Sequence, residues 1–239
     1  MDSTEAWRNL SCGIPSSLRL DDIFYSSVHK GSSVLVYGCG YGQTALDLQK
    51  EGYDVIAFDV NPMAIDVGRR RFKAYSRDRK YPSRVLFDIE NGLKLPYEED
   101  FFDAGVMEAY IGTFTDPEDR AKALEQASLV QKRHSILYLG VFALNEERMD
   151  RYERNLELTG EMGTFIVREG EEQDSRELYR VHHFTEPELR ELLEPTFRIE
   201  CLEHRTFMSR NGNPSPGFVV IARNYKSTAS SSDTALVSP

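Results

Sequence analysis

Short apolar runs alternate with longer amphipathic segments from Gly31 onward. The runs predict buried strands, and the amphipathic segments between them predict helices that begin near Thr44, Pro62 and Glu118. Strands that alternate with helices at this spacing are typical of βαβ units. We therefore predict an α/β fold with a doubly wound, mostly parallel sheet flanked by helices. The predicted strands are Val34–Tyr37, Val55–Phe58, Arg84–Phe87, Phe102–Met107 and Ser135–Phe142.

The segment 144–184 interrupts this rhythm, because it is highly charged and too long for a simple connection. Met149, Tyr152 and Leu156 lie at helical spacing within it, so we predict a helix over the ligand-binding edge of the sheet. This apolar stripe either lines a pocket or packs on the domain beneath a solvated charged face. A further helix follows at Thr185–Leu193, and Phe197–His204 with Gly217–Arg223 predict an antiparallel hairpin.

These elements predict one domain over residues 1–225. Within it, residues 1–30 are a lead-in that caps one edge, and residues 144–184 are an insertion that covers the active edge. Residues 226–239 are rich in Ser and Thr and poor in apolar residues, so we expect a flexible tail.

Composition narrows the functional class. The 239 residues include 29 Lys and Arg against 39 Asp and Glu, a net charge of −10, which disfavours a nucleic-acid partner. Membrane association is not expected, because apolar runs stay well short of the roughly 20 residues that span a bilayer. The three cysteines form no Cys-x-x-Cys pair, so we predict a reduced, cytoplasmic protein without a structural metal. The oligomeric state is open between monomer and homodimer.

A glycine-rich loop joins the first strand to the first helix, with glycines at 38, 40 and 42. Such a loop lets a ligand approach the backbone and the free N–H groups of the helix. Asp59 ends the second strand, 21 residues after Gly38, where a carboxylate can accept both hydroxyls of a ribose; the alternative is a helix cap. Asp88 ends the third strand and could accept from an exocyclic amine while Ile89 packs on the ring; the alternative is an ordinary turn aspartate.

These stretches make the chain similar to class I S-adenosylmethionine (SAM)-dependent methyltransferases, in particular small-molecule enzymes with a type 11/25 methyltransferase domain. The matching segments are 34–46, 52–65, 87–107 and 182–200. The resemblance implies a Rossmann-like sheet of seven strands with the seventh antiparallel, and SAM as cofactor. It also implies a ribose site at Asp59 and a methionine-side contact at Glu108. The cofactor-binding residues that it implies are Gly38, Cys39, Gly40, Gly42, Asp59, Val60, Asp88, Ile89 and Glu108.

The resulting hypothesis is transfer of a methyl group from SAM to oxygen or nitrogen of a small molecule, by in-line displacement. His182 and His183 are candidate bases; the alternative is one surface histidine and one stacked on Phe184. Glu108 and Tyr110, after the fourth strand, could orient the acceptor or merely shape the pocket.

Two other functions stay open. One is a methyltransferase-like cofactor-binding protein without catalysis, because the motifs include no obvious base and Val36 stands where relatives usually have an acidic residue. The other is an NAD-dependent oxidoreductase, against which Gln43 argues because it replaces the third glycine of a dinucleotide fingerprint.

Overall fold

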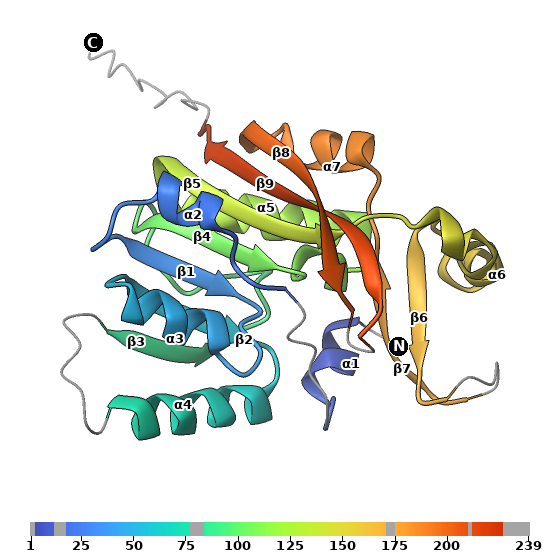
Figure 1. Ribbon diagram of the computed structural model, residues 1–239, viewed down its shortest axis with the longest axis horizontal. Coiled ribbons are helices and arrows are strands. Elements are labelled where there is room, and N and C mark those ends of the chain that lie inside the picture. The colour runs from blue at the N-terminus through green and yellow to red at the C-terminus, as the bar shows by residue number, and fades with distance from the viewer. Residues whose placement is uncertain (1–2, 12–17, 77–83, 171–174, 210–211, 227–239) are drawn as a thin grey trace, which may run out of the picture.

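The computed structural model describes residues 3–11, 18–76, 84–170, 175–209 and 212–226. Its centre is a seven-stranded sheet with the order β3-β2-β1-β4-β5-β9-β8 (Figure 1). The first five strands in the chain run parallel to one another, whereas β9 is antiparallel to both β5 and β8. The strands are β1 (Ser33–Tyr37), β2 (Asp54–Asp59), β3 (Val85–Ile89), β4 (Phe102–Glu108), β5 (Gln131–Phe142), β8 (Phe197–Met208) and β9 (Pro214–Asn224).

This topology confirms the predicted Rossmann-like fold and its antiparallel last strand. Helices cover the sheet on two sides, which gives three layers (Figure 1). The short α2 (Asp22–Ser27), α3 (Gln43–Lys50) and α4 (Pro62–Ser76) pack on one face. The helices α5 (Pro117–Val130) and α7 (Glu186–Leu193) pack on the other. The parallel strands lie between two hydrophobic cores, which is why their sequences are continuous apolar runs.

Local signals set most helix starts. Helix α4 begins at Pro62, whose fixed φ suits a first turn, and Asn61 caps it by accepting from the Ala64 N–H at 3.1 Å. Thr185 caps α7 as predicted, and Glu188 completes a capping box with it.

Several strand boundaries differ from the sequence prediction, and among the parallel strands two of them differ by two residues or more. Strand β5 begins at Gln131, four residues earlier than expected, because polar residues at its amino end gave no apolar signal. Strand β3 extends two residues further than expected, to Ile89, which pairs with Asp59 of β2. Because β3 ends later than expected, the residues that reach the ligand-binding edge of the sheet also come later in the sequence.

Residues 144–184, called the cover from here on, stand apart from the main sheet (Figure 1). The expected helix is α6 (Met149–Thr159), after the short turn η2 (Glu146–Arg148). The sequence prediction missed the antiparallel hairpin of β6 (Thr164–Arg168) and β7 (Glu177–His182). Tyr152 is buried, whereas Leu156 is exposed, so the predicted stripe anchors α6 at one position only.

The N-terminal lead-in contributes α1 (Ser3–Arg8), which packs on β7 of the cover. Trp7 lies against Tyr179, with ring centroids 4.2 Å apart. Asn61 donates from its side chain to the carbonyls of Trp7 and Leu10, both at 2.9 Å, and so ties the lead-in to the sheet edge. The lead-in therefore bridges the cover and the main sheet. The predicted tail at 226–239 lies outside the described residues, apart from Lys226, which pairs with Asp100.

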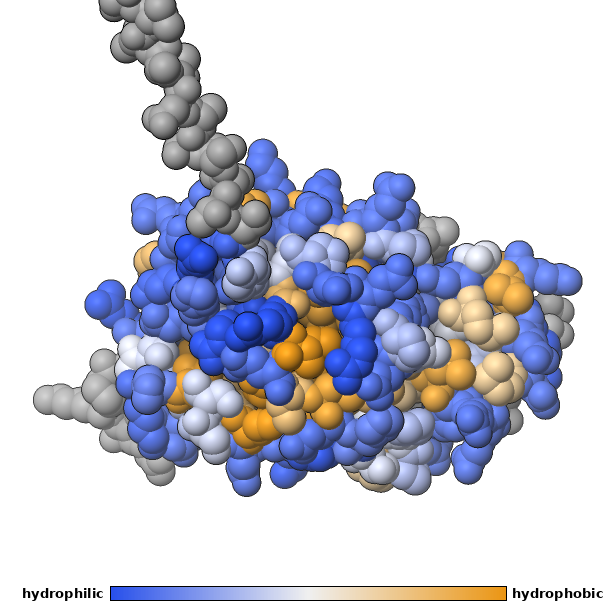
Figure 2. All heavy atoms as spheres, turned by 90° about the horizontal axis from the view of Figure 1, so that it is seen from above, coloured by the Kyte–Doolittle hydropathy of each residue, from blue (hydrophilic) through white to orange (hydrophobic). Residues whose placement is uncertain are grey.

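The side on which β8 and α7 lie is mostly hydrophilic, with apolar residues gathered near its centre (Figure 2). Within the described part of the chain, none of the helices has the length and apolar character needed to cross a membrane.

Candidate active site

A cavity of about 920 Å³ opens at the carboxyl ends of the parallel strands. This is the edge at which open α/β sheets bind ligands. The sheet forms one wall, the lead-in closes a second side with Thr4 and Trp7, and the cover forms the opposite wall. Residues from the sheet side include Gly38, Asp59, Val60, Asn61, Glu90, Asn91, Glu108, Ala109 and Tyr110.

The glycine loop turns sharply between β1 and α3. Its three glycines all have positive φ, from 51° to 76°. A Cβ added at Gly38 would lie 2.5 Å from the ring of Tyr110, and one at Gly42 would lie 2.6 Å from the ring of Phe87. Side chains are therefore excluded at both positions. Gly38 lines the cavity, whereas Cys39, Gly40 and Gly42 shape the loop behind it.

Asp59 holds this loop in place. One carboxylate oxygen accepts from the Gly40 N–H at 2.8 Å and the other from the Asn61 N–H at 2.9 Å. Burial raises the pKa of Asp59, although these N–H donors oppose the rise. Asp59 is 9% exposed and lines the cavity beside Val60, and its two oxygens have more lone pairs than these backbone donors occupy. The helix-cap alternative is therefore only part of its role.

Asp88 and Ile89, the two residues predicted at an adenine site, do not line the cavity. Asp88 lies within β3 and accepts from the Tyr97 hydroxyl at 3.0 Å, and Ile89 is exposed. The reason is the longer strand: the chain reaches the ligand edge only after β3 ends. The next two residues, Glu90 and Asn91, take the places on the cavity wall.

Glu108 ends β4 at the predicted edge and lines the cavity. One of its oxygens accepts from the Thr44 hydroxyl, while Oε1 is buried without a hydrogen-bond partner among the described residues. Burial raises the pKa of Glu108 to about 7, against the opposing hydrogen bond from Thr44. An unpartnered buried acceptor carries an energetic cost that a bound donor or cation can relieve.

Tyr110 also lines the cavity, but its ring is packed among Tyr37, Phe58 and Phe114. Burial raises its pKa well above the usual value, and its hydroxyl donates to the Asn91 carbonyl at 3.5 Å. Tyr110 therefore shapes the pocket, which was the second of its predicted roles.

His183 lines the cavity as a neutral ring. Burial lowers its pKa to about 3, with a smaller contribution from the positive charge of Arg148. Its Nδ1 lies 2.6 Å from the Tyr152 hydroxyl, which itself accepts from the Asn145 N–H. Because the hydroxyl proton then has Nδ1 as its acceptor, we assign the ring proton to Nε2. The ring stacks on Phe165 at an interplanar angle of 8°.

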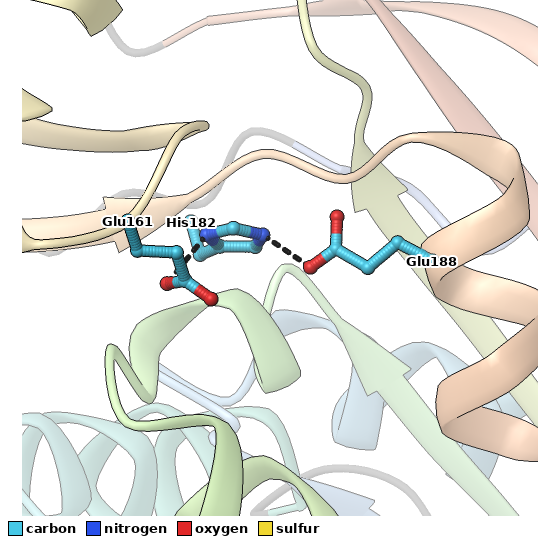
Figure 3. A group of neighbouring side chains, drawn as sticks. All are labelled: Glu161, His182 and Glu188. Atoms are coloured by element: carbon cyan, nitrogen blue, oxygen red, sulfur yellow. Dashed lines mark hydrogen bonds and ion pairs between the residues drawn. The ribbon is translucent and has the colours of Figure 1, made fainter.

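His182 sits between two carboxylates (Figure 3). Its Nδ1 lies 3.1 Å from Glu161 and its Nε2 lies 2.7 Å from Glu188. Burial lowers the pKa of His182, but the two carboxylates outweigh this effect and the net shift is upward. With both nitrogens occupied, the ring has no free lone pair with which to accept a proton. These contacts give His182 a structural role; its ring also lines the cavity and meets Phe184 edge-on.

Glu161, His182 and Glu188 also place one potential metal ligand each within 4.8 Å of one another. Glu161 already accepts from Arg120 and from the Thr164 hydroxyl. A metal ion would have to displace the proton of His182 and compete with the Arg120 guanidinium. We therefore assign Arg120, Glu161, His182 and Glu188 to an ion-pair network that joins α5, the cover and α7.

The sequence prediction missed several cavity residues. Trp7, Glu90 and Asn91 had no motif to mark them. Beside apolar residues of the β6–β7 hairpin, the cover lines the cavity with arginines, and α6 does so with these in place of the apolar stripe: Arg148, Arg151, Arg154 and Arg168. The available signal was the three- and four-residue spacing of Arg148, Arg151 and Asn155, which places them on one helix face.

Comparisons with known proteins identify the family and the fold. The methyltransferase domain family matches residues 34–134, which run from β1 to the start of β5. None of the curated proteins matches the sequence. A crystal structure of a SAM-dependent methyltransferase from Methanosarcina mazei is 30% identical. It matches with a TM-score of 0.82 over 88% of this chain and 100% of that chain.

Two more distant structures share the fold. One is the 1,6-didemethyltoxoflavin-N1-methyltransferase of Burkholderia thailandensis, solved with 1,6-didemethyltoxoflavin and S-adenosylhomocysteine (SAH). It is 19% identical, with a TM-score of 0.61 over 93% of this chain and 82% of that chain. The other is a putative methyltransferase from Bacillus halodurans, 14% identical, with a TM-score of 0.62 over 86% of this chain and 98% of that chain. From the identity and coverage of the Methanosarcina protein, the chain belongs to the SAM-dependent methyltransferases.

Proposed function

We propose that the protein transfers the methyl group of SAM to oxygen or nitrogen of a small molecule held between the sheet edge and the cover. One observation carries this proposal. One cavity connects the glycine loop, Asp59 and Glu108 with the inner wall of the cover. A cavity of about 920 Å³ has room for a cofactor and a small second ligand, but not for a macromolecular strand threaded through it.

The residues on the sheet side fit SAM. The missing side chain at Gly38 leaves the backbone open to a ligand, and Asp59 has free lone pairs for hydroxyl groups. The unpartnered Oε1 of Glu108 can accept a hydrogen bond from an ammonium group, and the ionised carboxylate attracts a sulfonium charge. When bound, SAM supplies a methyl group that is already activated by its sulfonium centre. The chain itself then has to align the acceptor and exclude water.

The cover both aligns the acceptor and excludes water. It covers the cavity opposite the sheet edge, where the stacked rings of Phe165 and His183 both line it. A neutral His183 with its proton on Nε2 is a hydrogen-bond donor, and its low pKa makes it a weak base. We infer that His183 orients the acceptor, and that the leaving proton of the acceptor goes to solvent or to ionised Glu108.

Calorimetry with SAH tests this function. We expect SAH to bind the wild-type protein, and Asp59→Ala to weaken that binding by about tenfold or more, because it removes the ribose acceptor and loosens the Gly40 loop. Asp66→Ala is the matched control, since Asp66 is exposed on α4 and pairs only with Arg70.

Three outcomes separate the alternatives. If neither SAM nor SAH binds, or if Asp59→Ala binds SAH as the wild type does, the proposal is wrong. Tighter binding of NAD than of SAM would favour an oxidoreductase. SAM binding without turnover in a mass-spectrometric screen of phenols, amines, thiols and carboxylates would favour a protein without catalysis.

A further inference from the structure

The cover presents four arginines to the cavity. Arg148 is the residue before α6, and Arg151 and Arg154 follow on the same helix. Arg168 ends β6 of the hairpin. Positions three apart lie on neighbouring parts of one helix face, so the cluster is built by the fold of the cover.

Three of these guanidinium groups are oriented by neutral partners. Arg148 donates to the Ser215 hydroxyl at 3.1 Å, and Arg168 donates to the Ser175 carbonyl at 2.8 Å. Arg151 lies over the ring of Phe165, 5.5 Å from its centroid. Such contacts fix the position of a cation without neutralising its charge.

The four arginines also form no ion pair within the described residues; Glu177, opposite Arg168 in the hairpin, pairs with Arg180 instead. Of the carboxylates in the part of the chain that is described, none lies within 4.0 Å of them. Some arginines outside the cavity are paired with carboxylates, as Arg120 is with Glu161 and Arg223 is with Glu200. The cavity wall is therefore a place where positive charge is left available for a ligand.

The opposite wall has the opposite sign. The sheet edge contributes three acidic residues to it: Asp59, Glu90 and Glu108. Among the described lining residues, the cover contributes one acidic residue, Glu169. An acidic wall suits the cationic sulfonium of SAM. A basic wall across the same cavity suits an anion, and guanidinium groups match carboxylates and phosphates with paired hydrogen bonds.

We propose that the methyl acceptor is an anionic small molecule, with a carboxylate or phosphate group held by Arg148, Arg151, Arg154 and Arg168. This inference rests on the proposed function, because it assigns the sheet side of the same cavity to SAM. The wall pairs the anion with several donors, so each arginine contributes to acceptor binding.

The test uses the full chain saturated with SAH, with calorimetry at low ionic strength. The carboxylate probe is phthalate, its neutral counterpart is phthalamide, and the phosphate probe is inorganic pyrophosphate. We expect at least one of the two anions to bind and phthalamide not to bind. The preferred anion then identifies the class of the acceptor group.

The variant is Arg151→Ala with Arg154→Ala. We expect it to weaken anion binding by at least about tenfold, the equivalent of about 1.4 kcal/mol, and to leave SAH affinity unchanged. The matched control is Arg84→Ala with Arg133→Ala, two exposed arginines outside the cavity that form no ion pair within the described residues.

Every other result contradicts either the proposed function or the inference about the acceptor. If SAH itself does not bind the wild type, the proposed function fails. The inference alone fails if SAH binds but neither anion does, if phthalamide binds as well as phthalate, or if the double variant binds the anions normally. It also fails if the double variant loses SAH affinity, since the arginines would then serve the carboxylate of the cofactor.

Discussion

Glu108 is a carboxyl group that titrates near neutral pH. Burial raises its pKa to about 7, so the ionised form grows as the pH rises through that value. SAM is a cation at sulfur, whereas SAH is neutral there. We therefore predict that SAM affinity relative to SAH affinity rises by about threefold or more between about pH 6 and about pH 8, as measured by calorimetry with both ligands.

Glu108→Gln keeps the shape of the side chain but removes the titration, so the ratio of the two affinities should become independent of pH. Glu118→Gln, on the exposed start of α5, should retain the wild-type profile. A pH-independent ratio in the wild type would show that Glu108 does not interact with the sulfonium charge.

Single residues of the site were predictable where backbone geometry demands one residue type. Gly38 and Asp59 were found this way, because their roles depend on a turn and on a strand end that the sequence marks. Asp88 was displaced from the cavity by a strand that ends two residues later than predicted. The ion pairs of His182 were not predictable, because its two carboxylate partners, Glu161 and Glu188, come from elements that only the tertiary structure brings together.

At the scale of elements, α1 forms part of the cavity and contains Trp7, the only tryptophan of the chain. Its Nε1 is buried without a partner among the described residues, and its ring contacts Tyr179 of the cover. We predict that SAH binding changes the tryptophan fluorescence in a saturable way, with the Kd that calorimetry gives. Trp7→Phe should abolish the signal and retain binding; an unchanged signal in a wild type that binds SAH would place the ligand away from α1.

The elements of the main sheet were predictable because each buried strand is an apolar run bounded by glycine or aspartate. The β6–β7 hairpin was not, although Thr164–Arg168 includes the β-favouring run Phe-Ile-Val. The surrounding charge hid it, since half of each strand faces the cavity or solvent. We propose that the arginines among these charged residues bind the acceptor. Hydrophobic periodicity cannot reveal this role, because the arginines gather on one cavity wall only when the cover folds.

At the scale of the whole molecule, the network of Arg120, Glu161, His182 and Glu188 fastens the cover to the core. Arg120 and His182 are almost fully buried, whereas Glu188 is about a third exposed. Removing one partner of a buried ion pair costs about 3–5 kcal/mol, and partial exposure reduces this. We therefore predict that His182→Ala lowers the free energy of unfolding by about 2–3 kcal/mol near pH 6, as measured by urea denaturation.

The pH dependence of that loss identifies its cause. Because the folded pKa of His182 is raised, its stabilising charge is fully present below its unfolded pKa of 6.5 and is lost as the pH rises through the folded value. The pKa of Glu161 is lowered to about 2, despite its burial, so its contribution is present above 4.5 and is lost as the pH falls toward 2. The difference between wild type and His182→Ala should therefore be largest between about pH 4.5 and 6.5 and should shrink at higher pH. The exposed His29→Ala should show no such profile. A difference that stays constant up to about pH 9 would mean that a neutral His182 stabilises the cover by packing alone.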